Sequence, residues 1–551
     1  MGFAFRFFAA GALFGVWTWF FGDPRDLSVV QIVHQDLIVF VLGAAVLGFV
    51  LQRRPVSALR IGADEARLCA YVSAAFAFIA GYAGAYIAAL NYPLSMDEFM
   101  ALFDARIIAS GDLLAPVPFG WQGLAKALQP IFLFKTDASY WSSTYLPVNA
   151  ALHAVMSFVD SALTAPLLAA LSVLLIFAIA RRIWPQRPDA AFVAVLLLVT
   201  SAQFIITAMT PYAMTAHLAL NLLWLWLFLR NTGASHGGAL VVGFAATGLH
   251  QLVFHPFFVA PFILSLWLGR RWRLAAAYTV GYGAICLFWI LYRNVIADSA
   301  GSGEGGVSAF IAQVEYLTRL FQYTPIIVFM PRNLVRFVAW QNPFTLVLFC
   351  LALGAIRRWA FPLPQLLAGI VLTLIFVVVV PYQGHGWGYR YLHGLLGSIS
   401  LIAAFAWIQF TGLEAARMRG ALIACSVFAA AMLPLRAFQM RSFTEPFARA
   451  SAVIAKTDAD IVLVDPTGIW FGADFARNDP YLVNRPKVLL LNRLTQEDVA
   501  RLCVGHKIAI FDLSTARTFG VPALSRVTVN NEIIRAFMAD KKCGVPIGTS
   551  P

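Results

Sequence analysis

Two adjacent carboxylates, Asp97 and Glu98, are the clearest candidates for chemistry in this sequence. They open a polar segment in which Ser95 and Glu98 fit a capping box, which marks the start of a helix. A helix over 96–110 puts Asp97 in its first turn, with Asp104 seven residues later on the same face. Asp97 is therefore a candidate general base. Glu98 is a second catalytic candidate with a structural capping role as the alternative, and the pair could hold a divalent cation, Mg²⁺ or Mn²⁺.

The same helix carries a run of apolar side chains, namely Phe99, Met100, Leu102, Phe103 and Ile107. A helix that is apolar on one face and follows a hydrophobic segment often lies in the plane of a membrane surface. We therefore predict that this helix rests on the bilayer, with Asp97 at the mouth of a cavity between the preceding hydrophobic helices.

The segment PYQGHGWGYRYLHGLLG supplies candidate cations for an anionic substrate. Arg390 stands at the entry of an apolar run, and His393 follows one turn later on the same face. An arginine among tryptophans and tyrosines also fits an interfacial aromatic belt, which is the alternative. Because cations at membrane depth are often functional, we assign Arg390 and His393 to a donor phosphate.

Other polar side chains are weaker candidates for substrate contacts. Lys135 and Tyr145 lie in the polar stretch that follows the Asp97 helix. His250 and His255 flank the outside end of one predicted span. Satisfied interfacial histidines are the favoured interpretation, and a phosphate or acceptor contact, which we assign to His255, is the functional alternative. Arg332 and Arg336 follow the glycine-rich stretch DSAGSGEGG and could belong to a mobile flap, although flexible linkage of a surface helix explains the same pattern.

The composition requires lipid as solvent for much of the chain. Of 551 residues, 60% are hydrophobic and only 12% are charged, about half the charged share of a soluble domain. The net charge of +13 does not indicate nucleic acid, because the arginines lie in short clusters between apolar runs instead of forming one basic face. The sequence therefore predicts an α-helical polytopic membrane protein.

Thirteen apolar segments are candidate membrane spans, since a span takes about 20 residues. They cover residues 3–21, 32–51, 68–90, 162–180, 190–209, 212–229, 238–254, 256–269, 274–292, 343–356, 365–380, 391–411 and 419–436. We place the break between the seventh and eighth segments at His255-Pro256, because the residue before a proline disfavours helix.

Arginine placement gives these spans a direction. With the N-terminus in the cytoplasm, fifteen arginines fall in the loops assigned to the cytoplasmic side, whereas the short loops opposite hold only Arg25 and Arg390. The long loops 91–161 and 293–342 and the C-terminal tail then face away from the cytoplasm.

The tail changes character at about residue 438. ADIVLVDP, KVLLLN and KIAIFDL predict strands, and TQEDVARLC predicts a helix with Thr495 as its N-cap. We therefore divide the chain into a transmembrane domain, 1–437, and a small soluble α/β domain, 438–551. Cys503 and Cys543 could form a disulfide outside the cytoplasm or remain two free thiols.

The Asp97 segment resembles the first outside loop of the C-type glycosyltransferase superfamily (GT-C), in the branch of the protein O-mannosyltransferases and aminoarabinose transferases. The residues that match the loop motif of that branch are Asp97, Glu98, Phe99, Gly111 and Asp112. Two features differ. The acidic pair follows three apparent spans instead of one, and WSSTYLP stands where the family has Lys-Pro-Pro.

The resemblance implies an enzyme of a bacterial inner membrane that transfers a sugar from a polyprenyl-phosphate donor to a lipid, glycan or protein acceptor outside the cytoplasm. It implies that Asp97 is the general base of an inverting displacement, and that cations stabilise the leaving phosphate. A transporter or flippase of lipid-linked substrates is the alternative, as is a glycan polymer ligase. The sequence shows no internal repeat and no paired broken spans, which disfavours the transporter.

Overall fold

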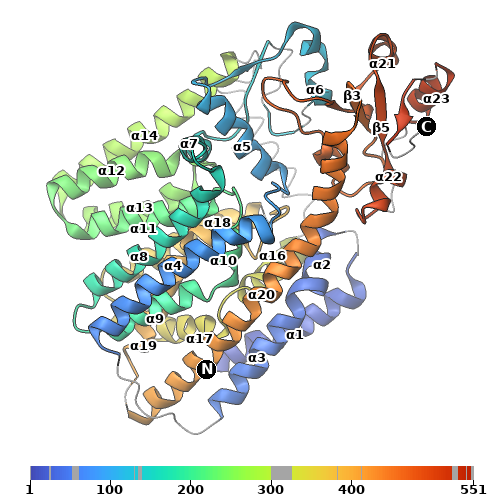
Figure 1. Cartoon of the computed structure of the whole chain (residues 1–551). Helices are drawn as coiled ribbons and strands as arrows, with labels where there is room; N and C mark the ends of the chain where they lie inside the picture. The colour runs from blue at the N-terminus through green and yellow to red at the C-terminus, as the bar shows by residue number, and fades with distance from the viewer. Residues whose placement is uncertain are drawn as a thin grey trace.

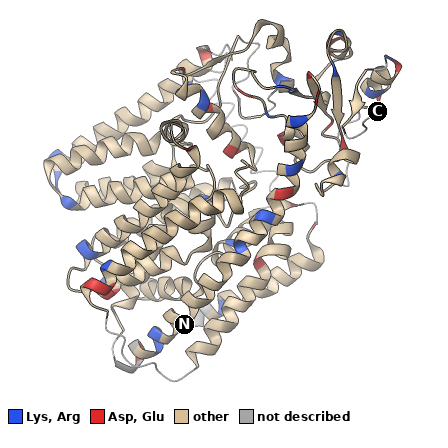
Figure 2. Cartoon of the chain, viewed as in Figure 1, with Lys and Arg blue, Asp and Glu red and all other residues tan. Residues whose placement is uncertain are grey.

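A computed structural model of the chain contains a helical bundle joined to a C-terminal unit built on a parallel sheet (Figure 1). It describes residues 2–23, 26–52, 61–128, 131–133, 139–299, 326–380, 383–410, 412–523, 531–541 and 543–547. Figure 2 shows that charged residues are sparse along the bundle helices.

A helix lies in each of the thirteen predicted apolar segments. These helices are α1 (Gly2–Phe21), α3 (Leu37–Leu51), α4 (Ala63–Ile87), α8 (Thr164–Ile183), α9 (Pro188–Val199), α11 (Met214–Arg230), α12 (Gly233–Thr247), α13 (Phe254–Leu268), α14 (Trp272–Ser299), α17 (Pro343–Gly354), α18 (Leu363–Val379), α19 (Leu396–Trp407) and α20 (Gly412–Lys456). The break between α12 and α13 falls at 248–253, so His255 belongs to the first turn of α13 and not to the break.

Five described helices are long and apolar enough to cross a bilayer, and α16 (Ile326–Ala339) with α17 would add a sixth if that pair, bent by 111°, is one span. Most of the others are shorter than a span, so the number of thirteen spans stays a prediction. The outward residues still point to lipid. On α14, Val280, Leu287 and Leu291 are 71%, 56% and 52% exposed, and a row of such side chains is unfavourable in water.

The N-terminal helices are joined to the bundle by a buried ion cluster. Asp36 ends a π-helical turn (Ile32–Asp36) between α2 (Leu27–Gln31) and α3. Its carboxylate pairs with Arg336 of α16 at 3.0 Å and Arg436 of α20 at 3.1 Å, and Trp340 donates to it at 2.6 Å. Asp36 and Arg436 are fully buried and Arg336 is nearly so, so one carboxylate compensates two buried cations.

We predict that Asp36→Asn destabilises the fold strongly, by about 3–5 kcal/mol, because it leaves two buried guanidinium groups uncompensated. Asp26→Asn is the matched control, since Asp26 pairs with one arginine, Arg332, and is 22% exposed. Thermal unfolding in detergent should show a much larger fall in melting temperature for Asp36→Asn. Equal falls in the two variants would contradict the role given to the cluster.

The C-terminal unit is a four-stranded parallel sheet in the order β4-β3-β5-β6. Its strands are β3 (Ile461–Val464), β4 (Lys487–Leu490), β5 (Ile508–Phe511) and β6 (Val545–Pro546), and its helices are α21 (Gln496–Cys503), α22 (Leu513–Thr518) and α23 (Glu532–Asp540). The three predicted strands and the helix capped by Thr495 are confirmed. Helix α20 runs without a break through residue 437, so the domain boundary there stays a prediction.

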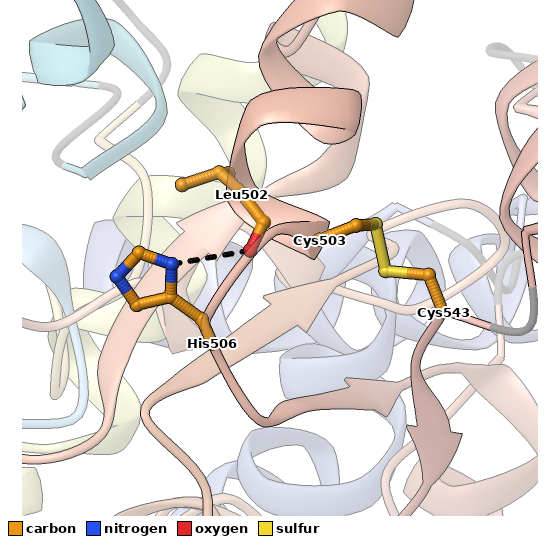
Figure 3. Close-up of a disulfide and its surroundings, with 4 residues drawn as sticks. All are labelled: Leu502, Cys503, His506 and Cys543. Carbon is orange, nitrogen blue, oxygen red and sulfur yellow. Dashed lines mark hydrogen bonds between the residues drawn. A yellow bond between two sulfur atoms is a disulfide. The ribbon is translucent and has the colours of Figure 1, made fainter.

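Cys503 and Cys543 form a disulfide, with their Cα atoms 5.8 Å apart (Figure 3). It ties the last residue of α21 to the segment that leads into the edge strand β6. Of the two alternatives that the sequence leaves open, the structure has the disulfide.

Both cysteines should therefore resist a maleimide reagent in the native protein and react with it only after reduction. Cys543→Ser should make Cys503 reactive without reductant and should destabilise the C-terminal unit by about 2–5 kcal/mol. Mass spectrometry of the labelled C-terminal peptides checks both statements. Labelling of Cys503 and Cys543 in the unreduced native protein would be the contrary result.

Helix α5 (Met96–Ala109) is covered by the C-terminal unit, and the prediction that it lies on the membrane surface is wrong. Its residues Met100, Phe103 and Ile107 share one hydrophobic core with Ile461 and Leu489 of the sheet. The core also includes residues from the short elements that follow α5: β1 (Ala115–Pro116), the 3₁₀ turn Phe119–Leu124, α6 (Ala125–Leu128) and β2 (Tyr140–Trp141). An apolar face shows that a helix is covered but not what covers it.

Candidate active site

The start of α5 fixes the two neighbouring carboxylates in different surroundings. The predicted capping box is present: Ser95 N donates to Glu98 Oε2 at 2.7 Å, and Glu98 N donates to Ser95 Oγ at 3.3 Å. Glu98 is buried, and its carboxylate caps the N-terminus of the helix. Asp97 lines a cavity with Asp104 of the same helix face.

Asp97 is bound by two side chains from distant parts of the chain. The guanidinium of Arg390 forms an ion pair with one carboxylate oxygen, and the hydroxyl of Tyr145 donates to the other. Arg390 begins the 3₁₀ turn Arg390–Leu395 before α19, and Tyr145 lies between β2 and α7 (Val148–Met156). The side chains of Arg390 and Asp97 are only 11% and 12% exposed, so the pair is largely removed from water.

The hairpin before α19 is shaped to present Arg390. Gly388 has a φ of +69°, and a Cβ there would lie 2.6 Å from Gln203, so only glycine fits. Arg390 N donates to Gln383 Oε1 at 2.9 Å, and its guanidinium lies 5.5 Å from the centre of the Tyr212 ring. The aromatic residues therefore surround the cation, and the backbone around it is fixed.

Charge and burial divide the carboxylates of α5 into two kinds. Burial alone raises the pKa of Asp97, but the charges of Arg390 and His250, with hydrogen bonds from Tyr145 and Arg390, hold that pKa below its ordinary value. Burial lowers the pKa of His250 to about 4, so Arg390 is the cation that acts at neutral pH. Burial raises the pKa of Glu98 to about 7 and that of Asp104 to about 6.

Asp104, which the sequence places on the same face as Asp97, is a site residue to which the sequence assigns no role. Ser143 N donates to its carboxylate at 3.0 Å, and the hydroxyls of Ser143 and Ser142 donate to it as well. Ser143 Oγ in turn accepts from Tyr145 N at 3.2 Å. Asp104 thus fixes the segment from which Tyr145 reaches Asp97. Its place seven residues after Asp97, on the same face, is the signal that could have identified it.

Two cavities meet at this segment. One is lined by Asp97, Tyr212 and His250 among other residues. The second lies towards the end of α14, where Tyr292 and Arg293 line it. Both are also lined by Asp104, Ser143, Tyr145 and Leu146. Tyr145 therefore lies between the cavity beside Asp97 and the cavity beside the end of α14.

The predicted histidines lie outside this cavity lining. His255 is fully buried, with Asn221 2.7 Å from Nδ1 and Tyr282 2.8 Å from Nε2, so it joins α11, α13 and α14. His393 is also fully buried, and neither of its ring nitrogens has a hydrogen-bond partner among the described residues. His250, which the sequence interpretation did not select for substrate binding, packs its ring against Tyr145 at a centroid distance of 4.0 Å.

The remaining predicted cations are not gathered around Asp97. Arg332 donates to Asp26 at 2.7 Å and Arg336 to Asp36 at 3.0 Å, which ties both arginines to the N-terminal helices. Arg336 also donates to the Gly386 carbonyl at 2.9 Å, four residues before Arg390. Lys135 and most of the predicted glycine-rich hinge lie outside the described residues.

Asp97 and Glu98 are both engaged by protein groups in this structure. Both oxygens of Asp97 are engaged, one by a guanidinium that a metal would have to displace, and Glu98 is directed to Ser95. Within the described ranges, no three histidine, cysteine, aspartate or glutamate side chains are grouped to hold a metal. The possible Mg²⁺ or Mn²⁺ stays a prediction, and we derive no step through it.

The fold is similar to that of a solved aminoarabinose transferase. A crystal structure of the aminoarabinose transferase ArnT from Cupriavidus metallidurans bound to undecaprenyl phosphate matches with a TM-score of 0.50 and 13% identity, over 76% of this chain and 85% of that one. The apo structure of the same protein matches with a TM-score of 0.49 and 12% identity, over 76% and 84% of the two chains.

A third match is more distant. The oligosaccharyltransferase of Archaeoglobus fulgidus, in complex with zinc and sulfate, has a TM-score of 0.45 and 13% identity, over 71% of this chain and 55% of that one. No protein-family model matches the sequence. No curated protein matches it either. At these identities the likeness to ArnT shows the fold alone.

The two roles considered for Glu98 lead to different outcomes for Glu98→Gln. Glutamine can still accept from Ser95 N, so the capping box persists. We expect transfer activity to be largely retained, in contrast to a substitution of Asp97. Because the folded state raises the pKa of Glu98 from 4.5 to about 7, this group lowers the free energy of unfolding as the pH rises between those two values, and the loss is complete above about pH 7.

Glu98→Gln should therefore raise the melting temperature above pH 8 and leave it unchanged below pH 4, where the wild-type carboxyl is protonated in both states. The pKa shift limits the gain to about 3 kcal/mol. Thermal unfolding at the two pH values, with an activity assay, tests the assignment. Loss of activity with an unchanged melting profile would show that Glu98 acts in catalysis.

Proposed function

We propose that this chain is a membrane glycosyltransferase that moves a sugar from a polyprenyl-phosphate donor to an extracytoplasmic acceptor with inversion at the anomeric carbon. The observation that carries the proposal is the buried ion pair between Arg390 and Asp97, the second of which lines a cavity, in a fold similar to that of ArnT. The crystal structure of ArnT with undecaprenyl phosphate supports the class of donor, since that protein shares the fold.

In the proposed reaction Asp97 acts as the general base. Its carboxylate accepts the proton of an acceptor hydroxyl while the acceptor oxygen bonds to the anomeric carbon. The bond between that carbon and the phosphate oxygen breaks, and its electron pair leaves with the polyprenyl phosphate. Attack on the face opposite the leaving group inverts the configuration.

Arg390 has two partners in this scheme. In the absence of substrate, Arg390 neutralises Asp97. When the donor is bound, the guanidinium turns to the donor phosphate, because a phosphate accepts paired hydrogen bonds from a planar guanidinium well. Release of Asp97 from the cation raises the pKa of the carboxyl and strengthens it as a base at the moment when the acceptor binds. Tyr145 keeps the freed carboxylate in place through its hydroxyl.

The proposed location is the inner membrane of a bacterium, with the N-terminus in the cytoplasm and the C-terminal unit in the periplasm. The distribution of arginines supports this direction. The Cys503–Cys543 disulfide supports an oxidising compartment for the C-terminal unit. The acceptor would then be a lipid, glycan or protein on the outer side of that membrane.

Asp97→Asn should reduce transfer by at least about 100-fold, because the amide cannot take the proton. The assay follows radiolabelled sugar from the polyprenyl-phosphate pool of host membranes into acceptor. Binding of undecaprenyl phosphate should persist in this variant, since Arg390 is intact, and should be lost in Arg390→Ala.

Asp64→Asn is the matched control, because the Asp64 side chain is 92% exposed and is not among the residues that line the cavity. Wild-type transfer by Asp97→Asn would overturn the general-base assignment. Labelled lipid that crosses vesicles without any covalent transfer would favour the flippase, and transfer of a whole glycan chain would favour the polymer ligase.

A further inference from the structure

Arg477 of the C-terminal unit contacts the segment that leads into the helix bearing Asp97. Its Nη2 donates to the Leu94 carbonyl at 2.9 Å, its Nη1 donates to the Pro93 carbonyl, and its Nε donates to the Asp474 carbonyl at 2.7 Å. All three guanidinium nitrogens thus donate hydrogen bonds to backbone carbonyl groups. The guanidinium therefore fixes the backbone of one segment against that of another.

Aromatic rings hold this guanidinium from the side of α5. The Arg477 guanidinium carbon lies 4.3 Å from the centre of the Tyr92 ring and 5.4 Å from that of Phe99. Tyr92 itself is held at its hydroxyl by Ser451 of α20, 2.8 Å away. A stacked and forked contact of this kind fixes position more firmly than a lysine ammonium could.

The bound carbonyls immediately precede the N-cap of α5. Pro93 and Leu94 lead into Ser95, whose hydroxyl begins the helix, and Asp97 follows in the first turn. The Tyr212 hydroxyl holds Ser95 Oγ from the bundle side at 2.8 Å. The place of Asp97 relative to Arg390 thus depends on a contact from the bundle and a contact from the C-terminal unit.

The segment 477–481 continues along α5 to its other end. Asp479 pairs with Arg106 in the last turn, and the Tyr481 hydroxyl donates to Asp112 at 2.9 Å. Trp141 Nε1 donates to the Pro480 carbonyl at 2.6 Å. The helix is therefore held at both ends by the same strand-connecting segment, and its apolar face is buried against the sheet.

We propose that the C-terminal unit is a working part of the transfer site, with Arg477 as the positioning residue that sets the place of Asp97. This inference rests on the function proposed above. A displacement of about 1 Å between reacting groups can cost about 100-fold in rate, so loss of this contact should reduce turnover without removing any group that touches the substrate.

The test compares Arg477→Ala, Arg477→Lys and Arg485→Ala in the full-length protein. Arg485 is the matched control, because it lies in the same unit, pairs with Asp460 at 2.9 Å and is 67% exposed. Arg477→Ala should lower the transfer rate at saturating donor roughly 10- to 100-fold, with undecaprenyl phosphate binding within about threefold of wild type because Arg390 is untouched. The transfer rate of Arg477→Lys should lie between those of Arg477→Ala and the wild type. The transfer rate of Arg485→Ala should equal that of the wild type.

Two further readouts separate positioning from simple stabilisation. Millimolar guanidinium should restore part of the rate of Arg477→Ala and none of the rate of Asp97→Asn. Amide hydrogen exchange at residues 95–98 should accelerate in Arg477→Ala, while exchange at 103–107 stays at the wild-type level.

A wild-type rate for Arg477→Ala would overturn the proposal, as would a loss of rate that tracks the melting temperature and shows no guanidinium rescue. Failure of the proposed function is recognised separately. In that case Asp97→Asn is active, and the hydrogen exchange of residues 95–98 still reports whether Arg477 positions the helix.

Discussion

The buried ion pair between Asp97 and Arg390 is the interaction on which the rest of the site depends. The two residues are 293 positions apart in the chain, and each is largely excluded from water. Either charge alone would be costly in that place, and the pair is favourable only with good geometry and further hydrogen bonds. Tyr145 supplies such a hydrogen bond to Asp97, whereas Arg390 Nε has no hydrogen-bond partner among the described residues.

The carboxylates near the pair illustrate how surroundings decide chemical role. Asp97 and Glu98 are adjacent in sequence, yet a cation lowers the pKa of the first whereas burial raises that of the second to about 7. Asp104 resembles Glu98 in its raised pKa but holds serines instead of a helix cap. Of the three, only Asp97 combines an ionised state with access to a cation that a phosphate could claim.

The sequence was sufficient for features that depend on neighbouring residues. The capping box of Ser95 and Glu98, the helix in each apolar segment, and the strands of the tail follow from local patterns that the structure confirms. Topology also placed Arg390 on the side of Asp97, because the positive-inside rule orders all loops at once.

Features that depend on distant partners could not be predicted in this way. The apolar face of α5 gave no sign that a sheet some 360 residues later would cover it. Arg332 and Arg336 were interpreted as cations for a substrate, because nothing local shows that Asp26 and Asp36 compensate them. His250 and His255 differ by five positions, and only the actual break between α12 and α13 decides which one reaches the cavity.

Elements near the two ends of the chain support the two partners of the ion pair, Asp97 and Arg390. At the N-terminal end, Gln31 and Arg336 both donate to the Gly386 carbonyl, at 3.4 Å and 2.9 Å, and Arg336 is itself held by Asp36. This fixes the hairpin that presents Arg390. At the C-terminal end, Arg477 fixes the residues that precede Asp97.

Neither charged residue lies in the interior of an α-helix. Arg390 lies in a short 3₁₀ turn and Asp97 in the first turn of α5, where helix geometry constrains the backbone least. Supports from outside each element are therefore needed, and this gives the N-terminal helices and the C-terminal unit the same physical task, each for one partner of the ion pair.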